Sequence, residues 1–266
     1  MRIVKEPEVF LVAATELVDN GLNNYLDAIG NPAWKPDPHG SSAENVIEAG
    51  GRLCYMSWQP YDPSKPEATN PNVKKVREGN DVYLKNVLES KHGALLEHCC
   101  VTFIFKDLSR VCTHELVRHR AGMAYSQQSL RYIRLDDLGF WMPPSVVADE
   151  VLSDIFVETV NALEGVQKKL AKHTGIDEVK NFHLKKQMTS MFRRLAPIGL
   201  ATSIMVTGNL RSWRHVIELR TSPAAEEEIR LVIGKAAALL KPKYPNVFQD
   251  MSLGDDGSWV FEHSKV

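Results

Sequence analysis

The sequence predicts an α+β fold, with a mixed or antiparallel sheet flanked by helices. Segments with the apolar periodicity of helices are interspersed with β-branched and aromatic segments, without the regular strand–helix alternation of a parallel α/β fold. The 266 residues are 44% hydrophobic and 24% charged, which is typical of a globular protein with a substantial core.

In the first half of the chain, composition separates compact elements from loops. The apolar VFLVAA at 9–14 predicts a buried strand, and the Pro-, Gly- and Asn-rich segment 30–42 predicts a loop. Four prolines within 58–80 predict a surface excursion. The remaining elements expected here are helices at 43–52 and 81–90 and a strand at 98–106.

In the second half, Ser109 can cap a helix that runs to about Arg120. A loop at 121–128 and extended chain at 129–134 should follow it. Beyond these, periodicity and the positions of proline predict helices at 146–170, 179–194, 210–220 and 224–240, and a strand at 199–207.

Charge and motifs exclude several classes of protein. Lys and Arg total 32 against 33 Asp and Glu, so bulk binding to nucleic acid or to an anionic membrane is not expected. We expect no signal peptide or membrane span, and the common phosphate-loop, dinucleotide-binding, hydrolase and zinc-protease motifs are absent. Four cysteines form no metal-binding spacing and should be reduced core residues of a cytoplasmic protein: Cys54, Cys99, Cys100 and Cys112.

Guanidinium groups gather in RHRAGMAYSQQSLRY, which begins at Arg118 and contains no lysine or carboxylate. The planar, two-pronged donor suits phosphates and carboxylates. On the expected helix, Glu115 shares a face with Arg118 and His119. In extended chain, Ser129 and Arg131 share a face that can grip a phosphate. The alternative is a basic helix end that complements the helix dipole.

A second polar concentration is VTGNLRSWRHVIELRTS. Arg211 and His215 are four residues apart and share a helix face. Asn209 occupies the N-cap position, and capping alone can explain it. A buried guanidinium at Arg220 needs an anionic partner, for which the candidates are Glu218 and Glu228.

A third concentration is KHGALLEHCCVTF, which places His92 and His98 at a helix-to-strand transition. A metal site would have to recruit His114 and His119, which are five residues apart and diverge on a helix. We therefore expect a structural role for His98 and no metal site.

Together these three segments resemble the flavin-dependent thymidylate synthases. The family's Arg-His-Arg, short spacer and Ser-x-Arg-Tyr are matched at 118–120 and 129–132. Its upstream His and Glu-His resemble His92 and Glu97-His98. Its downstream blocks resemble Arg193, Leu195-Ala196-Pro197, Asn209-x-Arg211 and the helix to Arg220. The match covers roughly 43–250, apart from the proline-rich excursion.

The resemblance implies a single domain over 1–266, with an N-terminal extension at 1–42 and a surface excursion at 58–80. It also implies a homotetramer whose active sites are shared between subunits and contain FAD. The implied reaction is reductive methylation of dUMP to dTMP. Methylenetetrahydrofolate would donate the carbon, NADPH would reduce the flavin, and no cysteine nucleophile would be used.

The resemblance also assigns roles by position. For FAD it implies His92, Ala94, Arg118, His119, Arg120, Ala121, Gln127, Asn209, Arg211 and His215. For dUMP it implies Glu115, Arg118, Gln127, Gln128, Ser129, Leu130, Arg131, Arg193 and Arg220. Arg220 is the implied catalytic residue, because a fixed cation that stabilises N3-deprotonated uracil makes C5 a better nucleophile.

Three features depart from the family pattern. Eight residues separate Arg120 from Ser129, where seven is usual. Glu115 stands where Gln is common, so we expect it to pair with Arg118 or to bind a ribose hydroxyl. Ala224 replaces a residue that in relatives can be a flavin-stacking His. These departures leave open a family member without turnover. Non-catalytic binding of nucleotide or RNA is a further alternative, which the scarcity of aromatic residues in the arginine segment disfavours.

Overall fold

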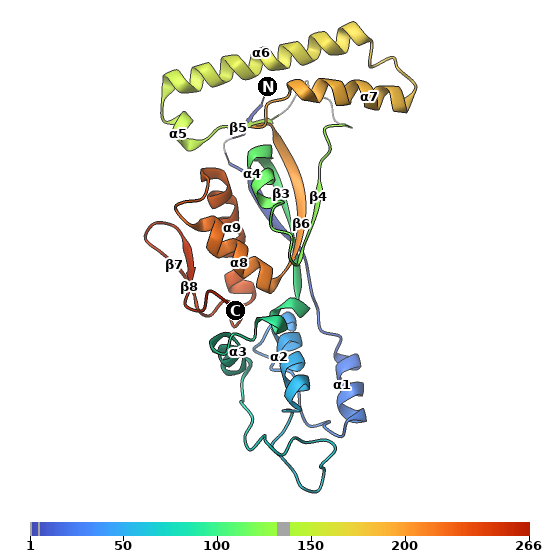
Figure 1. Ribbon diagram of the computed structural model, residues 1–266, viewed down its shortest axis with the longest axis vertical. Coiled ribbons are helices and arrows are strands. Elements are labelled where there is room, and N and C mark those ends of the chain that lie inside the picture. The colour runs from blue at the N-terminus through green and yellow to red at the C-terminus, as the bar shows by residue number, and fades with distance from the viewer. Residues whose placement is uncertain (1, 5, 132–138) are drawn as a thin grey trace.

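The structure, a computed structural model, describes residues 2–4, 6–131 and 139–266 (Figure 1). Its centre is a four-stranded antiparallel sheet of order β2-β3-β6-β4, made of Glu8–Ala14, Cys100–Ser109, Ala201–Asn209 and Met123–Gln127. Two small sheets pair β1 (Arg2–Val4) with β5 (Gly139–Trp141) and β7 (Met251–Leu253) with β8 (Trp259–Phe261). The predicted α+β class is confirmed.

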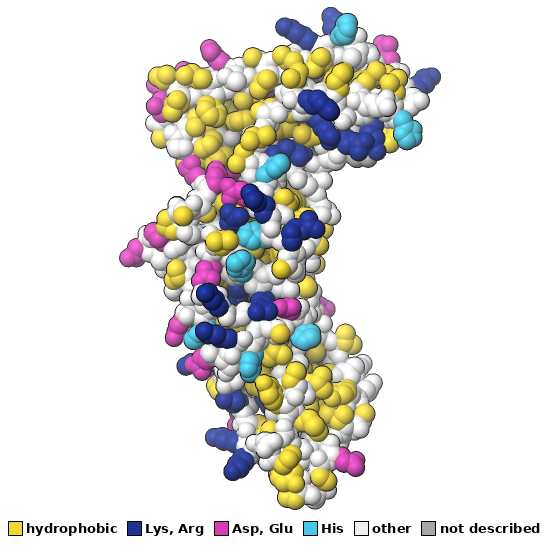
Figure 2. All heavy atoms as spheres, in the orientation of Figure 1, with side chains coloured by type: hydrophobic (Ala, Val, Ile, Leu, Met, Phe, Trp, Pro, Cys, Tyr) yellow, Lys and Arg dark blue, Asp and Glu magenta, His cyan; other side chains and the backbone are white. Residues whose placement is uncertain are grey.

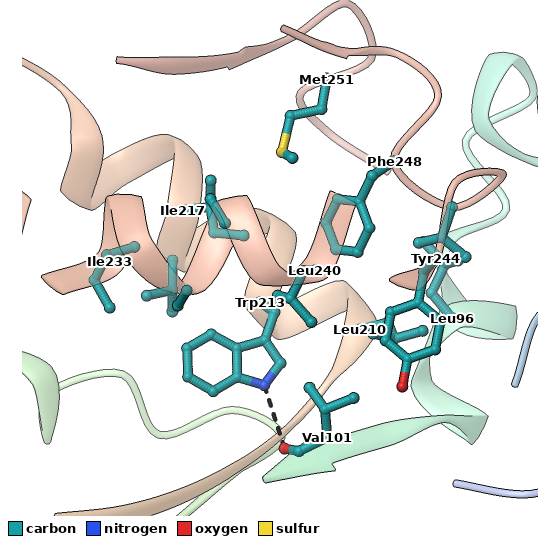
Figure 3. Close-up of a cluster of buried hydrophobic side chains, with 14 of the residues drawn as sticks. Leu96, Val101, Leu210, Trp213, Ile217, Ile233, Leu240, Tyr244, Phe248 and Met251 are labelled. Atoms are coloured by element: carbon teal, nitrogen blue, oxygen red, sulfur yellow. Dashed lines mark hydrogen bonds between the residues drawn. The ribbon is translucent and has the colours of Figure 1, made fainter. Parts of the chain in front are cut away.

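Helices α8 (Leu210–Thr221) and α9 (Glu227–Lys243) cover one face of the sheet (Figure 1). Their apolar stripes meet alternate residues of the strands, and Trp213 is fully buried among them. The Trp213 indole N–H donates to the carbonyl of Val101 at 3.4 Å (Figure 3). A buried indole needs such a partner, so this bond aligns α8 on β3.

A helical lobe lies at one end of the sheet (Figure 1). Its α2 begins with a capping box in which the Ser41 hydroxyl accepts from the Glu44 N–H and the Glu44 carboxylate accepts from the Ser41 N–H. The same buried carboxylate accepts the backbone N–H groups of Asn246 and Val247, at 2.6 and 3.0 Å. This ties the lobe to the chain after α9. The lobe consists of α1 (Asp19–Ala28), α2 (Ser42–Tyr55), α3 (Asn80–Glu89) and the 3₁₀ helix η1 (Gly93–His98).

An arm of helices lies across the other end of the sheet (Figure 1). It contains α5 (Pro144–Val147), α6 (Glu150–Thr174), α7 (Phe182–Phe192) and the 3₁₀ turn η2 (Arg193–Leu195). With 25 residues, α6 is about 37 Å long. Hydrophobic side chains are exposed along it (Figure 2). Across the described ranges, no helix is long and apolar enough to cross a membrane.

Several expected elements differ in the structure. The helix after Ser109, α4 (Arg110–Leu116), ends before Arg118, and the expected loop at 121–128 contains strand β4. The chain at 129–131 is a turn in which the Arg131 N–H donates to the Ser129 hydroxyl at 3.3 Å, so the extended prediction is wrong there. Residues 132–134, including Tyr132 of the family motif, lie outside the described residues.

Two burial predictions were also wrong. Cys54 and Cys100 are exposed, whereas Cys99 and Cys112 are buried as expected. Strand β2 is only half-buried, because α9 covers one side of the sheet and leaves Phe10 and Val12 exposed on the other.

Candidate active site

The Arg-His-Arg segment forms a turn between α4 and β4. Ser109 caps α4 by accepting from the Cys112 N–H at 3.2 Å, and the helix ends at Leu116. The Tyr125 hydroxyl then donates to the carbonyls of Leu116 and His119, at 2.9 and 2.5 Å. Because Tyr125 belongs to β4, the strand fixes the backbone of the turn at Leu116 and at His119.

Gly122 closes this turn against the first residues of α8. Its φ is +65°, and a Cβ there would lie 2.3 Å from Asn209 Nδ2 and 2.5 Å from Ser212 Oγ. The Gly122 carbonyl accepts the Asn209 N–H at 3.1 Å, and the Ser212 hydroxyl donates to the Ala121 carbonyl at 2.8 Å. Only glycine tolerates both the positive φ and the close approach of the Asn209 and Ser212 side chains. Gly122 therefore allows the turn to pack directly against the start of α8.

A cavity of about 430 Å³, the α8 cavity, lies between this turn and α8. Its described lining holds one carboxylate, Glu97, which pairs with Arg211 at 2.5 Å. Arg118 and Arg120 make no ion pair with a described carboxylate, so the cavity carries uncompensated positive charge. Seven of the residues expected to bind FAD line it: Arg118, His119, Arg120, Ala121, Asn209, Arg211 and His215.

Arg220 is fixed beside this cavity by two partners. Its Nε–H donates to His119 Nε2 at 2.8 Å, and its Nη1 donates to Glu115 Oε2 at 2.8 Å. The carboxylate partner is therefore Glu115, not Glu218 or Glu228, and Glu115 does not pair with Arg118. Glu115 and Arg220 are 105 positions apart in the sequence, which explains why no local sequence pattern revealed this ion pair.

His119 is held in its neutral form. Burial, then the charge of Arg220 and that of His215, lower the pKa of His119 to about 4. The His215 ring lies 5.9 Å away at 70°. A neutral imidazole leaves Nε2 free to accept from Arg220, so the electrostatics and the hydrogen bond are consistent.

A second cavity of about 540 Å³, the arginine cavity, lies beyond the other end of β4. Five of the residues expected to bind dUMP line it: Gln127, Gln128, Ser129, Leu130 and Arg193. Arg110 and Arg194, which were not expected from the sequence, complete the lining, in which no described residue is acidic. Figure 2 shows Lys, Arg and His side chains gathered over the middle of this face, in the region of α4 and α8.

Arg110 is the most constrained of these cations. Burial and the nearby charge of Arg193 lower its pKa. Its Nη2 donates to the Gln128 carbonyl at 2.9 Å, while its buried Nε has no partner in the structure. A cation in the first turn of a helix also opposes the helix dipole. That unfavourable placement is the signal in the sequence that could have identified Arg110.

Three expected site residues line neither of these two cavities, and a fourth lines one of the two that were expected for it. His92 lines a third cavity, and Ala94 is exposed on η1 outside the described lining of the α8 cavity. Gln127, expected at both the FAD and the dUMP site, lines the arginine cavity and not the α8 cavity, and its Nε2 donates to the Thr113 hydroxyl at 3.1 Å. Arg131 lies outside both linings, and its carbonyl accepts from the Thr189 hydroxyl at 2.8 Å.

The family model described as "Thymidylate synthase complementing protein" matches residues 39–246. The chain belongs to this family. A flavin-dependent thymidylate synthase of Corynebacterium diphtheriae is 35% identical over 230 residues, covering 85% of this chain and 86% of that protein. One of Mycobacteroides abscessus is 35% identical over 232 residues, covering 85% and 87%. The resemblance drawn from the three sequence segments is confirmed, and so is the expectation of an enzyme.

The fold of this thymidylate synthase complementing family member also has a solved counterpart. It is similar to the crystal structure of a UMP/dUMP methylase, PolB from Streptomyces cacaoi, bound with 5-Br dUMP. The TM-score is 0.58 at 14% identity, with 94% of this chain and 96% of that chain covered.

Proposed function

We propose that the protein is a cytoplasmic enzyme that converts dUMP to dTMP by reductive methylation. Methylenetetrahydrofolate is the carbon donor, FAD is the bound cofactor and NADPH is the reductant. The observation that carries the proposal is the fixed guanidinium of Arg220, which is held by Glu115 and by His119, a residue that lines the α8 cavity. Membership in a family whose curated relatives are named flavin-dependent thymidylate synthases supports it.

The nucleotide phosphate binds in the arginine cavity. Arg110 and Arg193 crowd there without a carboxylate among the described lining residues, so a dianion relieves their mutual repulsion. Arg110 and Glu115 lie on the same helix, about 7 Å apart along its axis. The base of the same mononucleotide then lies against Arg220, which Glu115 of this helix holds.

Arg220 stabilises the negative charge that builds on uracil N3 and its carbonyl groups. Its Nε and Nη1 are engaged by His119 and Glu115, which leaves Nη2 for the base. A fixed cation at that position makes C5 more nucleophilic toward the one-carbon unit. Glu115 and neutral His119 act by holding the guanidinium of Arg220 in place. The Gln that is common in the family at this position can accept the same hydrogen bond, so both residue types orient the guanidinium in the same way.

The α8 cavity has the donor set that an anionic dinucleotide needs. Arg118 and Arg120 are free of ion pairs with described carboxylates, and Asn209, Arg211 and His215 approach from α8. These residues, with His119 and Ala121, would hold FAD. When bound, the flavin supplies the reducing equivalents that complete the methyl group, and the protein supplies orientation and charge.

The proposed assembly is a homotetramer with active sites shared between subunits. Side chains of Phe10, Ile104 and Met205 lie in one cross-strand row on the sheet face that α8 and α9 leave open. Val151 and Ile155 of α6 are also exposed, at 68% and 53%. Exposed apolar side chains on the sheet and on α6 favour contact with further subunits.

Arg220→Ala tests the proposed function. We expect this variant to lose the dUMP-dependent release of tritium from uracil C5 while it retains FAD, measured by visible absorbance. Arg230→Ala is the matched control, because Arg230 is on α9 and donates to the Asp256 carbonyl, away from both cavities. Near-normal tritium release by Arg220→Ala would remove Arg220 from its role, and an apoprotein unable to take up flavin would contradict the cofactor assignment.

A further inference from the structure

A third cavity of about 360 Å³ lies between the proline-rich excursion and helices α2 and α3. We call it the excursion cavity. Its lining includes Lys74, Lys75 and Arg77 from the excursion, Arg52 and the adjoining Tyr55 from α2, and His92.

Arg52 holds the wall of the cavity in place. It is buried on α2 and donates through Nη1 to the Ser57 carbonyl and through Nη2 to the Arg77 carbonyl, both at 2.7 Å. Ser57 directly precedes the excursion and Arg77 lies near its end, so one guanidinium ties both ends of the excursion to the helix. Glu48 neutralises Arg52, with Nε–H donating to Oε1 at 2.8 Å. The excursion is therefore a fixed part of the lobe.

The charge of the remaining lining is uncompensated. Lys74, Lys75 and Arg77 make no ion pair with any described carboxylate, and no described residue that lines the cavity is acidic. Three cations beside one cavity repel each other, and a bound anion relieves that repulsion. Their flexible, exposed side chains suit a ligand with several separated negative groups.

The lining of the cavity also contains aromatic rings. The rings of Tyr55 and His92 are stacked, with centroids 6.2 Å apart and planes inclined by 21°. Tyr55 remains 52% exposed, so it keeps surface for a further planar group. The lining of the cavity thus offers both a stacking surface and positive charge.

The excursion cavity adjoins the α8 cavity. His92 lines the former and Glu97 lines the latter, and both flank the short η1 segment. Between them, a Cβ on Gly93 would lie 2.8 Å from Nε of Arg211, which lines the α8 cavity. The short η1 segment therefore connects the walls of the two cavities.

We propose that the excursion cavity binds the anionic portion of an aromatic co-substrate. A planar ring would stack near Tyr55 and His92, and carboxylates or phosphates would bind Lys74, Lys75 and Arg77. This inference rests on the proposed function, which requires two co-substrates with this chemistry. The folate donor carries glutamate carboxylates, and NADPH carries phosphates.

The double variant Lys74→Ala/Lys75→Ala tests the inference by steady-state kinetics. We expect the KM of one co-substrate to rise roughly tenfold at low salt, and the KM of dUMP to stay unchanged. Higher ionic strength should reduce the difference. A rise that grows with the number of glutamates on the folate identifies the folate tail, and a rise confined to NADPH identifies its phosphates. Lys65→Ala, in the same excursion but outside the described lining, should match the wild type.

An equilibrium titration keeps this inference separate from the proposed reaction. Calorimetry with p-aminobenzoyl-triglutamate and with NADP⁺ should show one probe binding about tenfold more weakly to the double variant than to Lys65→Ala. Equal affinities of both proteins for both probes would overturn the inference, even if the wild type synthesises dTMP. A wild type without turnover would contradict the proposed function, and the titration would still decide whether the cavity binds anions.

Discussion

At the scale of the residue, burial and the charges of Arg220 and His215 keep His119 neutral, which predicts how the stability of the protein depends on pH. Its pKa is lowered to about 4, while an unfolded chain has an ordinary value near 6.5. The unfolded state therefore takes up a proton first as the pH falls. The stability that His119 contributes is present above about pH 6.5 and is lost as the pH falls toward 4.

Nuclear magnetic resonance of the imidazole nitrogens measures this directly. We expect Nε2 to be unprotonated at neutral pH and the ring to titrate near pH 4. Arg220→Ala removes one of the charges that lower the pKa, so the midpoint should move upward in that variant. A wild-type midpoint near 6.5, or no change in Arg220→Ala, would contradict the arrangement around Arg220.

The expected site residues show what sequence alone can reveal. Arg118, His119 and Arg120 were predicted together, because they are neighbours in the chain. The partnership of Glu115 with Arg220 depends on how α4 and α8 pack, and no local pattern encodes it. Arg110 was missed for a related reason, since its proximity to Arg193 arises only when α4 and η2 meet beside β4.

At the scale of the element, Arg52 holds the excursion and α2 together. Arg52→Met would leave the buried Glu48 carboxylate uncompensated and free the carbonyls of Ser57 and Arg77. We expect a loss of about 3–5 kcal/mol in the free energy of unfolding, measured by urea denaturation. Lys85→Met on α3 breaks only a surface pair with Glu89, so its effect should stay within about 1 kcal/mol. Similar stabilities for the two variants would refute the anchoring role.

The elements predicted correctly are those with strong local patterns. Ser41 and Glu44 form a capping box that marks the start of α2, and Asn209 is an N-cap residue that marks the start of α8. Strand β4 was expected as a loop, because its alternation of small and polar residues is weak, and pairing with β6 makes it a strand. Helix α1 contains Gly21 and three asparagines, which favour turns, and it was missed.

At the scale of the whole molecule, the exposed arm predicts association. Ile155→Glu places a charge on the exposed apolar side of α6. We expect this variant to shift the proposed tetramer toward smaller species and to lower the activity. Light scattering coupled to size-exclusion chromatography measures the mass. Asn161→Glu is the matched control, because Asn161 is also exposed on α6 but lies about 120° around the helix from Ile155, and it should leave the mass unchanged. A monomeric wild type at micromolar concentration would contradict the shared-site assembly.

The central claim concerns cations from distant parts of the chain that meet on one nucleotide. A crystal structure of the flavin-loaded protein with dUMP tests it most directly. We predict the phosphate within hydrogen-bonding distance of Arg110 and Arg193, and the uracil against Nη2 of Arg220. A nucleotide bound away from these residues, with Arg193 and Arg220 facing unrelated crevices within and between protomers, would contradict the account.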